Sequence, residues 1–124
     1  MKYVADAMLN GLAKELPKRG EISCTTALNE VWKERDSSKP GKYDAKIFRF
    51  FLEKNYKLTP LEDPEKYMLI TADKDLARYF EEFGLNYRLA RKPESRQAFK
   101  TMADRLATEI LSGQLERSVE ETSE

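Results

Sequence analysis

The chain has 124 residues with no formal net charge and 35% charged residues, a length that supports one domain with a single core. The balanced charge excludes a general attraction to nucleic acid or to membranes, so any nucleic-acid surface must be a local patch. The absence of His and the presence of a single Cys, Cys24, exclude a Ser-His-Asp triad, a Cys-His pair, most zinc sites and an internal disulfide. We expect Cys24 to be a buried structural thiol.

Apolar spacing predicts two strands and three helices in the first half of the chain. In chain order these are a strand at 2–5, a helix at 8–16, a strand at 21–25, a helix carrying Leu28, Val31 and Trp32, and a helix at 44–55. A loop at 36–42 separates the last two helices, because this segment is rich in Pro, Gly and Ser.

The second half predicts two further strands and two further helices. In chain order these are a loop at 56–66, a strand at 67–71, a helix at 74–83, a strand at 86–90, and a long helix from Pro93 to about Leu111. Gly84 and Gly113 follow the two helices, at the position where a left-handed residue commonly ends a helix.

Strands that alternate with helices predict an α/β fold with a small, mostly parallel sheet. We expect three layers, with helices on both faces of the sheet and an additional C-terminal helix. A single domain over 1–113 and an acidic, disordered tail over 114–124 follow from the same pattern. No apolar run is long enough to span a bilayer and no signal-peptide pattern begins the chain, so we expect a cytoplasmic protein with no membrane contact.

Acidic residues follow two of the predicted strands and begin two of the predicted helices. Asp6 follows the strand at 2–5, Asp73 and Asp75 follow the strand at 67–71, and Glu30 and Asp44 lie near helix starts. Because the carboxyl ends of neighbouring parallel strands meet at one edge of a sheet, these carboxylates are expected to converge there. At about 4 Å and an effective dielectric near 20, each like-charged pair costs roughly 4 kcal/mol unless a cation neutralises it. Oxygen ligands of this kind suit Mg²⁺ or Mn²⁺.

Helix capping is an alternative explanation for each of these acids, because Asp is a favoured N-cap residue. For any one acid taken alone, capping or simple surface exposure is the favoured interpretation. Only the joint placement of several acids at strand ends favours a metal site. Between the two acids after the third strand, Asp73 is the better metal-ligand candidate, and Asp75 is better placed as a favourable charge in the first helical turn.

Three segments of the chain resemble the PIN-like family, in its Mut7-C-like and toxin-like ribonuclease branches. They are residues 4–13, residues 23–31, and residues 69–77 with the Phe-Gly-Leu sequence that follows at 83–85. The resemblance implies a divalent-metal-dependent endoribonuclease that acts on single-stranded RNA with Mg²⁺ or Mn²⁺. The catalytic acids that it implies are Asp6, Glu30, Asp44, Asp73 and Asp75, and the metal ligands among them are Asp6, Asp44 and Asp73.

Departures from the family pattern keep a second hypothesis open. Ala7 stands where toxin-like members usually carry Ser, Thr or Asn, and Glu30 and Asp44 are closer together than in those members. A catalytically degenerate PIN-like domain that binds RNA or a protein is therefore the alternative. A small structural α/β protein whose acids are helix caps is the third hypothesis.

Basic residues near the predicted site are candidates for substrate binding. Lys14, Lys33 and Lys42 are expected to contact RNA phosphates. Another basic cluster near the last strand contains Arg88, Arg91, Lys92 and Arg96. For both groups, solvated side chains on helix faces are the alternative. The expected partners are single-stranded RNA, an antitoxin or other protein, and a second copy of the chain. The apolar stripe of the long C-terminal helix is explained either by such a homodimer or by a helix that covers a sheet edge.

Overall fold

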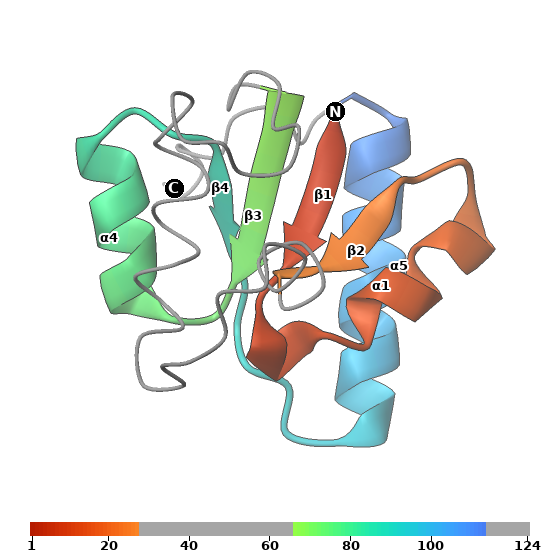
Figure 1. The fold of residues 1–124 in the computed structure, drawn as a ribbon. Helices are drawn as coiled ribbons and strands as arrows, with labels where there is room; N and C mark the ends of the chain where they lie inside the picture. Colours follow the sequence, from red (N-terminus) through yellow and green to blue (C-terminus); the bar gives the residue numbers. More distant parts are fainter. Residues whose placement is uncertain (28–65, 114–124) are drawn as a thin grey trace, which may run out of the picture.

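The computed structural model describes residues 1–27 and 66–113 of the chain (Figure 1). The strands of this part are β1 (Lys2–Ala5), β2 (Cys24–Thr26), β3 (Tyr67–Thr71) and β4 (Tyr87–Leu89). The helices are η1 (Ala7–Leu9), α1 (Leu12–Glu15), η2 (Pro17–Arg19), α4 (Lys74–Glu82) and α5 (Arg96–Leu111). Glu30, Lys33, Lys42 and Asp44 lie outside the described residues, as do the predicted loop at 36–42, the helix at 44–55, most of the loop at 56–66 and the tail.

The four described strands form one parallel sheet in the order β2-β1-β3-β4. The two central strands are β1 and β3, with Val4 opposite Leu69 and Ala5 opposite Ile70. All five residues of β3 are buried, as expected of a parallel strand that is covered on both faces. The prediction of a parallel α/β fold with a C-terminal helix is confirmed in this part of the chain. The carboxyl ends of the strands therefore lie at one edge of the sheet (Figure 1).

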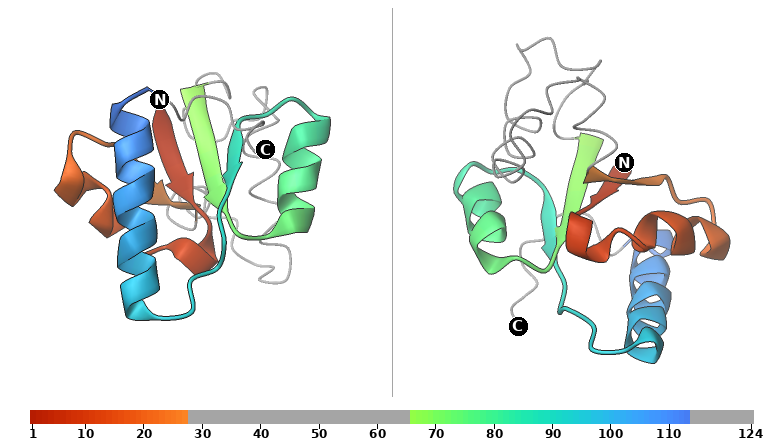
Figure 2. Two further views of the ribbon diagram at one scale, coloured as in Figure 1. Left: turned by 180° about the vertical axis from the view of Figure 1, so that it is seen from behind. Right: turned by 60° about the horizontal axis from the view of Figure 1, so that its bottom comes forward.

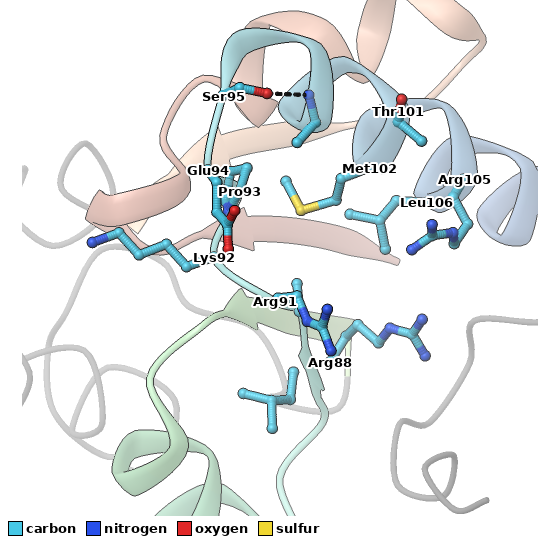
Figure 3. A pocket seen from close by; sticks show the side chains of 13 residues that line it. Arg88, Arg91, Lys92, Pro93, Glu94, Ser95, Thr101, Met102, Arg105 and Leu106 are labelled. Atoms are coloured by element: carbon cyan, nitrogen blue, oxygen red, sulfur yellow. Dashed lines mark hydrogen bonds between the residues drawn. The ribbon is translucent and has the colours of Figure 1, made fainter.

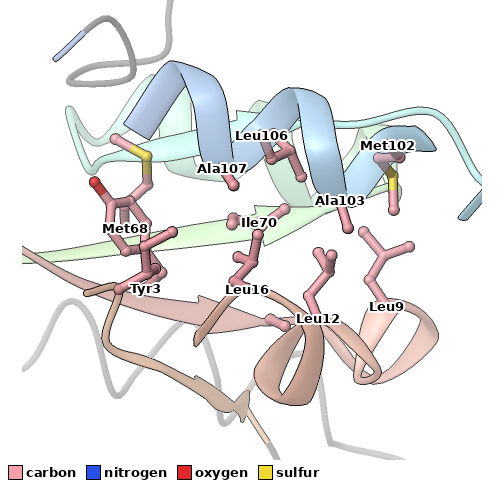
Figure 4. Close-up of a cluster of buried hydrophobic side chains, with 12 residues drawn as sticks. Tyr3, Leu9, Leu12, Leu16, Met68, Ile70, Met102, Ala103, Leu106 and Ala107 are labelled. Carbon is pink, nitrogen blue, oxygen red and sulfur yellow. The ribbon is translucent and has the colours of Figure 1, made fainter. Parts of the chain in front are cut away.

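One face of the sheet packs against α1 and α5. Ala5 and Ile70 point to this face, where they join a cluster that includes Leu12 of α1 and Leu106 of α5 (Figure 4). Cys24 is partly buried against the same cluster, as expected for a structural thiol. Burial raises the pKa of this thiol to about 12, so Cys24 is protonated near neutral pH and is a poor nucleophile.

The opposite face of the sheet packs against α4. Val4 and Leu69 alternate with the residues of the first face and contact a cluster that includes Phe80 of α4. Figure 2 shows α4 and α5 on opposite sides of the strands. In the part of the chain that the structure describes, no helix is both long and apolar enough to cross a membrane.

The predicted continuous helix at 8–16 is wrong, because the segment forms two short helices, η1 and α1, and η2 follows it. Gly11 lies at the break between η1 and α1, where a Cβ atom would stand 2.9 Å from the Phe99 ring of α5. Gly also favours a break, since it is a weak helix former. Leu12 and Leu16 are buried as expected, whereas Met8 is 51% exposed.

The last two helices differ from the prediction at their ends. Helix α5 begins at Arg96 instead of Pro93, because Ser95 has an extended backbone and its side chain accepts a hydrogen bond from the Ala98 amide. Helix α4 ends at Glu82, so Phe83 is its C-cap and is 55% exposed instead of buried. Gly84 has a φ of +68°, which confirms the predicted left-handed residue after this helix.

Candidate active site at the carboxyl edge of the sheet

Asp6 lies at the end of β1 and is almost completely buried, with 4% of its surface exposed. Its amide donates a hydrogen bond to the Ile70 carbonyl of β3 at 2.9 Å. One carboxylate oxygen, Oδ1, accepts a hydrogen bond from the Ala7 amide at 2.7 Å and so caps η1. The other, Oδ2, accepts a hydrogen bond from the Thr71 hydroxyl at 2.7 Å. Asp6 is therefore fixed to both central strands at the predicted edge of the sheet.

Thr71 connects the two acids that follow the central strands. It is fully buried at the end of β3, where its hydroxyl donates to Asp6 and accepts a hydrogen bond from the Asp73 amide at 3.0 Å. The sequence showed Thr71 only as the last residue of a strand. A hydroxyl that ends a buried apolar run, just before an acidic turn, was the one available sign of this role.

Asp73 is the N-cap residue of α4. Its Oδ1 atom accepts hydrogen bonds from the Asp75 amide at 2.9 Å and from the Leu76 amide at 3.2 Å. The capping interpretation is therefore confirmed for Asp73, as it is for Asp6. Capping does not remove the capacity to bind a cation, since an ionised carboxylate accepts about four hydrogen bonds or ligand contacts.

Asp75 lies in the first turn of α4, where it is a favourable charge near the helix N-terminus. Its side chain is 80% exposed and lies 3.5 Å from Arg78, so it is solvated.

Lys14 is exposed on α1. Residues 1–27 and 66–113 contain no group of three acidic or thiol side chains placed to hold a metal ion. The predicted set of five acids is therefore not assembled by the described residues alone, and it stays a prediction for Glu30 and Asp44.

The environment of Asp6 is unusual for a carboxylate. A buried charge is costly unless it is paired and hydrogen-bonded. Asp6 accepts two hydrogen bonds but has no ion-pair partner among the described residues. A carboxylate held in one orientation at this edge has the oxygen chemistry that divalent cations bind. The arrangement therefore fits a role for Asp6 as a metal ligand whose orientation is fixed by Thr71.

The chain matches no protein-family model, no curated protein and no solved structure.

Proposed function

We propose that the chain is a divalent-metal-dependent endoribonuclease of the PIN-like type, which cleaves single-stranded RNA with Mg²⁺ or Mn²⁺. The observation that carries the proposal is the buried Asp6 carboxylate, held by the Thr71 hydroxyl at the carboxyl edge of β1 and β3. The three-layer PIN-like arrangement and a cytoplasmic location are parts of the same proposal.

In this proposal Asp6 is the central metal ligand and Asp73 is the second. The Asp73 Oδ1 atom caps α4, so the second oxygen of this carboxylate is the one assigned to the metal. Asp44 is the third ligand, and Glu30 and Asp75 complete the acidic set. Thr71 holds the Asp6 carboxylate in one orientation, and Lys14, Lys33 and Lys42 bind RNA phosphates. When bound, the cation supplies an activated water and stabilises negative charge on the phosphate.

Two substitutions test the metal site, and circular dichroism of each variant checks that the fold is retained. Asp6→Asn and Asp73→Asn each remove a charge, and Asn is as good an N-cap as Asp, so the cap of α4 is retained in the second variant. Cleavage of a labelled single-stranded RNA in Mn²⁺ is expected to fall by more than about a hundredfold in each variant. This loss is larger than the loss usual when a residue that only supports a metal ligand is changed. Glu82→Gln is the matched control, because Glu82 is an exposed acid of α4 outside the site.

Two results would overturn the proposal. One is RNA cleavage that persists in a chelator, and the other is full activity in both Asn variants. Mg²⁺ is also expected to raise the melting temperature of the wild-type protein by mass action, and to do so less in Asp6→Asn.

The second candidate function is a catalytically degenerate PIN-like domain that binds RNA or a protein partner. This function is favoured by the capping roles of Asp6 and Asp73. It is also favoured by Ala7, because the PIN-like family that the chain resembles usually has a polar side chain at this position. RNA binding without cleavage, unchanged by chelator and by Asp73→Asn, would support this function. Metal-dependent turnover would exclude it.

Two kinds of protein partner belong to the ribonuclease proposal. A toxin-like ribonuclease would bind an antitoxin protein, and a second copy of the chain is the other candidate partner. The apolar stripe of α5 does not supply the homodimer interface, because Met102 and Leu106 pack against the sheet within the chain. Co-expression with a candidate antitoxin is expected to suppress RNA cleavage, and light scattering measures whether the chain is a dimer. If the chain is a monomer and no co-expressed protein reduces its activity, both partners are removed from the proposal.

A further inference from the structure

A cavity of about 730 Å³ lies between α5 and the segment that connects β4 to α5 (Figure 3). This volume falls within the range of small-molecule sites, about 300–1,000 Å³. One wall is apolar and includes Ala98, Met102 and Leu106 of α5. These residues are spaced by four along the helix, so they share one face of α5. Met102 and Leu106 also belong to the buried cluster under the sheet and are only 7% and 2% exposed. Ala98 and the 40% exposed Leu89 of β4 therefore offer the apolar contact surface for the organic part of a ligand.

The rest of the cavity is strongly basic. Four cationic side chains and one acidic side chain, Glu94, line it. Arg88 forms an ion pair with Glu109 of α5 at 3.1 Å. Arg91, Lys92 and Arg105 are exposed and have no ion-pair partner within the described residues. Three positive charges are therefore available to a ligand, in a chain whose overall charge is balanced.

The positive groups reach the cavity from two directions. Arg88 and Arg91 come from the β4 side, and Arg105 comes from α5 beside Leu106 (Figure 3). Ser95, the N-cap of α5, also lines the cavity, so the positive end of this helix dipole lies near it. Guanidinium groups in such an arrangement suit the tetrahedral oxygens of a phosphate, to which they donate paired hydrogen bonds.

We infer that this cavity binds an organic phosphate monoester of nucleotide size. With Glu94 included, the unpaired groups of the lining carry a net charge of +2, which matches the near-double negative charge of a phosphate monoester better than the single charge of a carboxylate. Leu89 and Ala98 contact the organic group. The Ala90 amide, which also belongs to the cavity lining, donates a hydrogen bond to the Thr71 carbonyl at 2.8 Å. The cavity therefore adjoins the carboxyl edge that carries Asp6, yet it contains none of the proposed metal ligands.

Titration with adenosine monophosphate, followed by calorimetry or by amide NMR shifts, tests the inference. Arg105→Gln and Arg91→Gln are each expected to weaken the affinity by about tenfold or more, the effect of one charge-assisted hydrogen bond. Arg96→Gln is the matched control, because Arg96 is an exposed arginine of the same helix that does not line the cavity. Glu94→Gln is expected to strengthen binding, since it removes the one acidic group of the lining.

Adenosine without phosphate is expected to bind at least tenfold more weakly than the monophosphate (roughly one charge-assisted contact). The inference is overturned if the wild-type protein shows no saturable binding of adenosine monophosphate at millimolar concentrations. It is also overturned if Arg105→Gln and Arg91→Gln bind as tightly as Arg96→Gln, or if adenosine binds as tightly as the monophosphate.

Two further measurements separate this inference from the ribonuclease proposal and define the source of the phosphate. Asp6→Asn is expected to abolish cleavage and to leave the affinity for adenosine monophosphate unchanged, so failure of either hypothesis is visible without the other. A short single-stranded RNA with a 5′-phosphate, compared with the same RNA bearing a 5′-hydroxyl, shows whether the cavity accepts an RNA end. Equal affinity for the two RNAs would assign the cavity to free nucleotides.

Discussion

Thr71→Val removes one hydroxyl from the centre of the candidate site and keeps the volume and the branching of the side chain. The hydroxyl donates to Asp6 Oδ2 at 2.7 Å and accepts from the Asp73 amide at 3.0 Å. The substitution therefore removes one of the two hydrogen bonds that hold the Asp6 carboxylate, and it leaves a backbone amide without its acceptor.

The expected cost follows from the burial of these groups. A hydrogen bond to a charged group contributes about 1.5–3 kcal/mol and a neutral one about 1 kcal/mol. Thr71 is 0% exposed and Asp6 is 4% exposed, so water does not readily replace the lost hydroxyl. We expect Thr71→Val to lower the free energy of unfolding by about 3 kcal/mol, the sum of the two contributions.

Urea unfolding followed by circular dichroism measures this cost. Thr108→Val is the matched control, because the Thr108 hydroxyl donates to the Asp104 carbonyl on the exposed face of α5. The control is expected to change the free energy of unfolding by less than about 0.5 kcal/mol. A double-mutant cycle with Asp6→Ala should give a coupling energy above about 1 kcal/mol. If Thr71→Val costs no more than Thr108→Val, the hydroxyl does not support the Asp6 carboxylate.

Three further predictions concern residues outside the site. Arg19 hydrogen-bonds the Glu15 carboxylate and holds its pKa below the usual 4.5, so this contribution to stability is present above that pH and is lost as the pH falls through the lowered pKa. Urea midpoints at about pH 6 and about pH 3 should therefore differ less in Glu15→Gln than in wild type, and equal differences would contradict this. Burial raises the pKa of the Cys24 thiol to about 12. Near pH 8, Cys24 should therefore react with a thiol reagent about a thousandfold more slowly in the native protein than in the unfolded protein. Rates within about tenfold would contradict the burial of the thiol. Gly84→Ala should lower the free energy of unfolding in urea by about 1 kcal/mol, because the φ of Gly84 is +68° and a Cβ atom is strained there. Gly84→Asn should lower it less, since Asn tolerates this conformation. Equal losses in the two variants would contradict backbone strain as the cause.

The sequence predicted the centre of the sheet well and the short helices poorly. Residues 67–71 match β3 at both ends, because a continuous apolar run followed by an acidic turn is typical of a buried parallel strand. The helix expected at 8–16 is interrupted near Gly11, where Phe99, which lies far away in the sequence, approaches the backbone so closely that a Cβ atom would stand 2.9 Å from its ring. Helical periodicity describes only local spacing, so it does not report such a contact. The predicted start of the last helix at Pro93 is wrong for a different reason, because Ser95 caps α5 and the helix begins at Arg96.

The candidate site shows a different limit of sequence-based prediction. Helix capping and metal binding both require a carboxylate where a strand ends and a helix begins, so the sequence around Asp73 is the same for either role. The structure shows the capping role, because the cap hydrogen bonds go to Oδ1, and the metal role stays a proposal for the other oxygen. The second oxygen takes no part in the cap, and the two roles are therefore compatible in one residue. Asp73→Ala would remove both together, whereas Asp73→Asn keeps the cap and removes the charge. Only the Asn variant thus distinguishes a catalytic acid from a structural one.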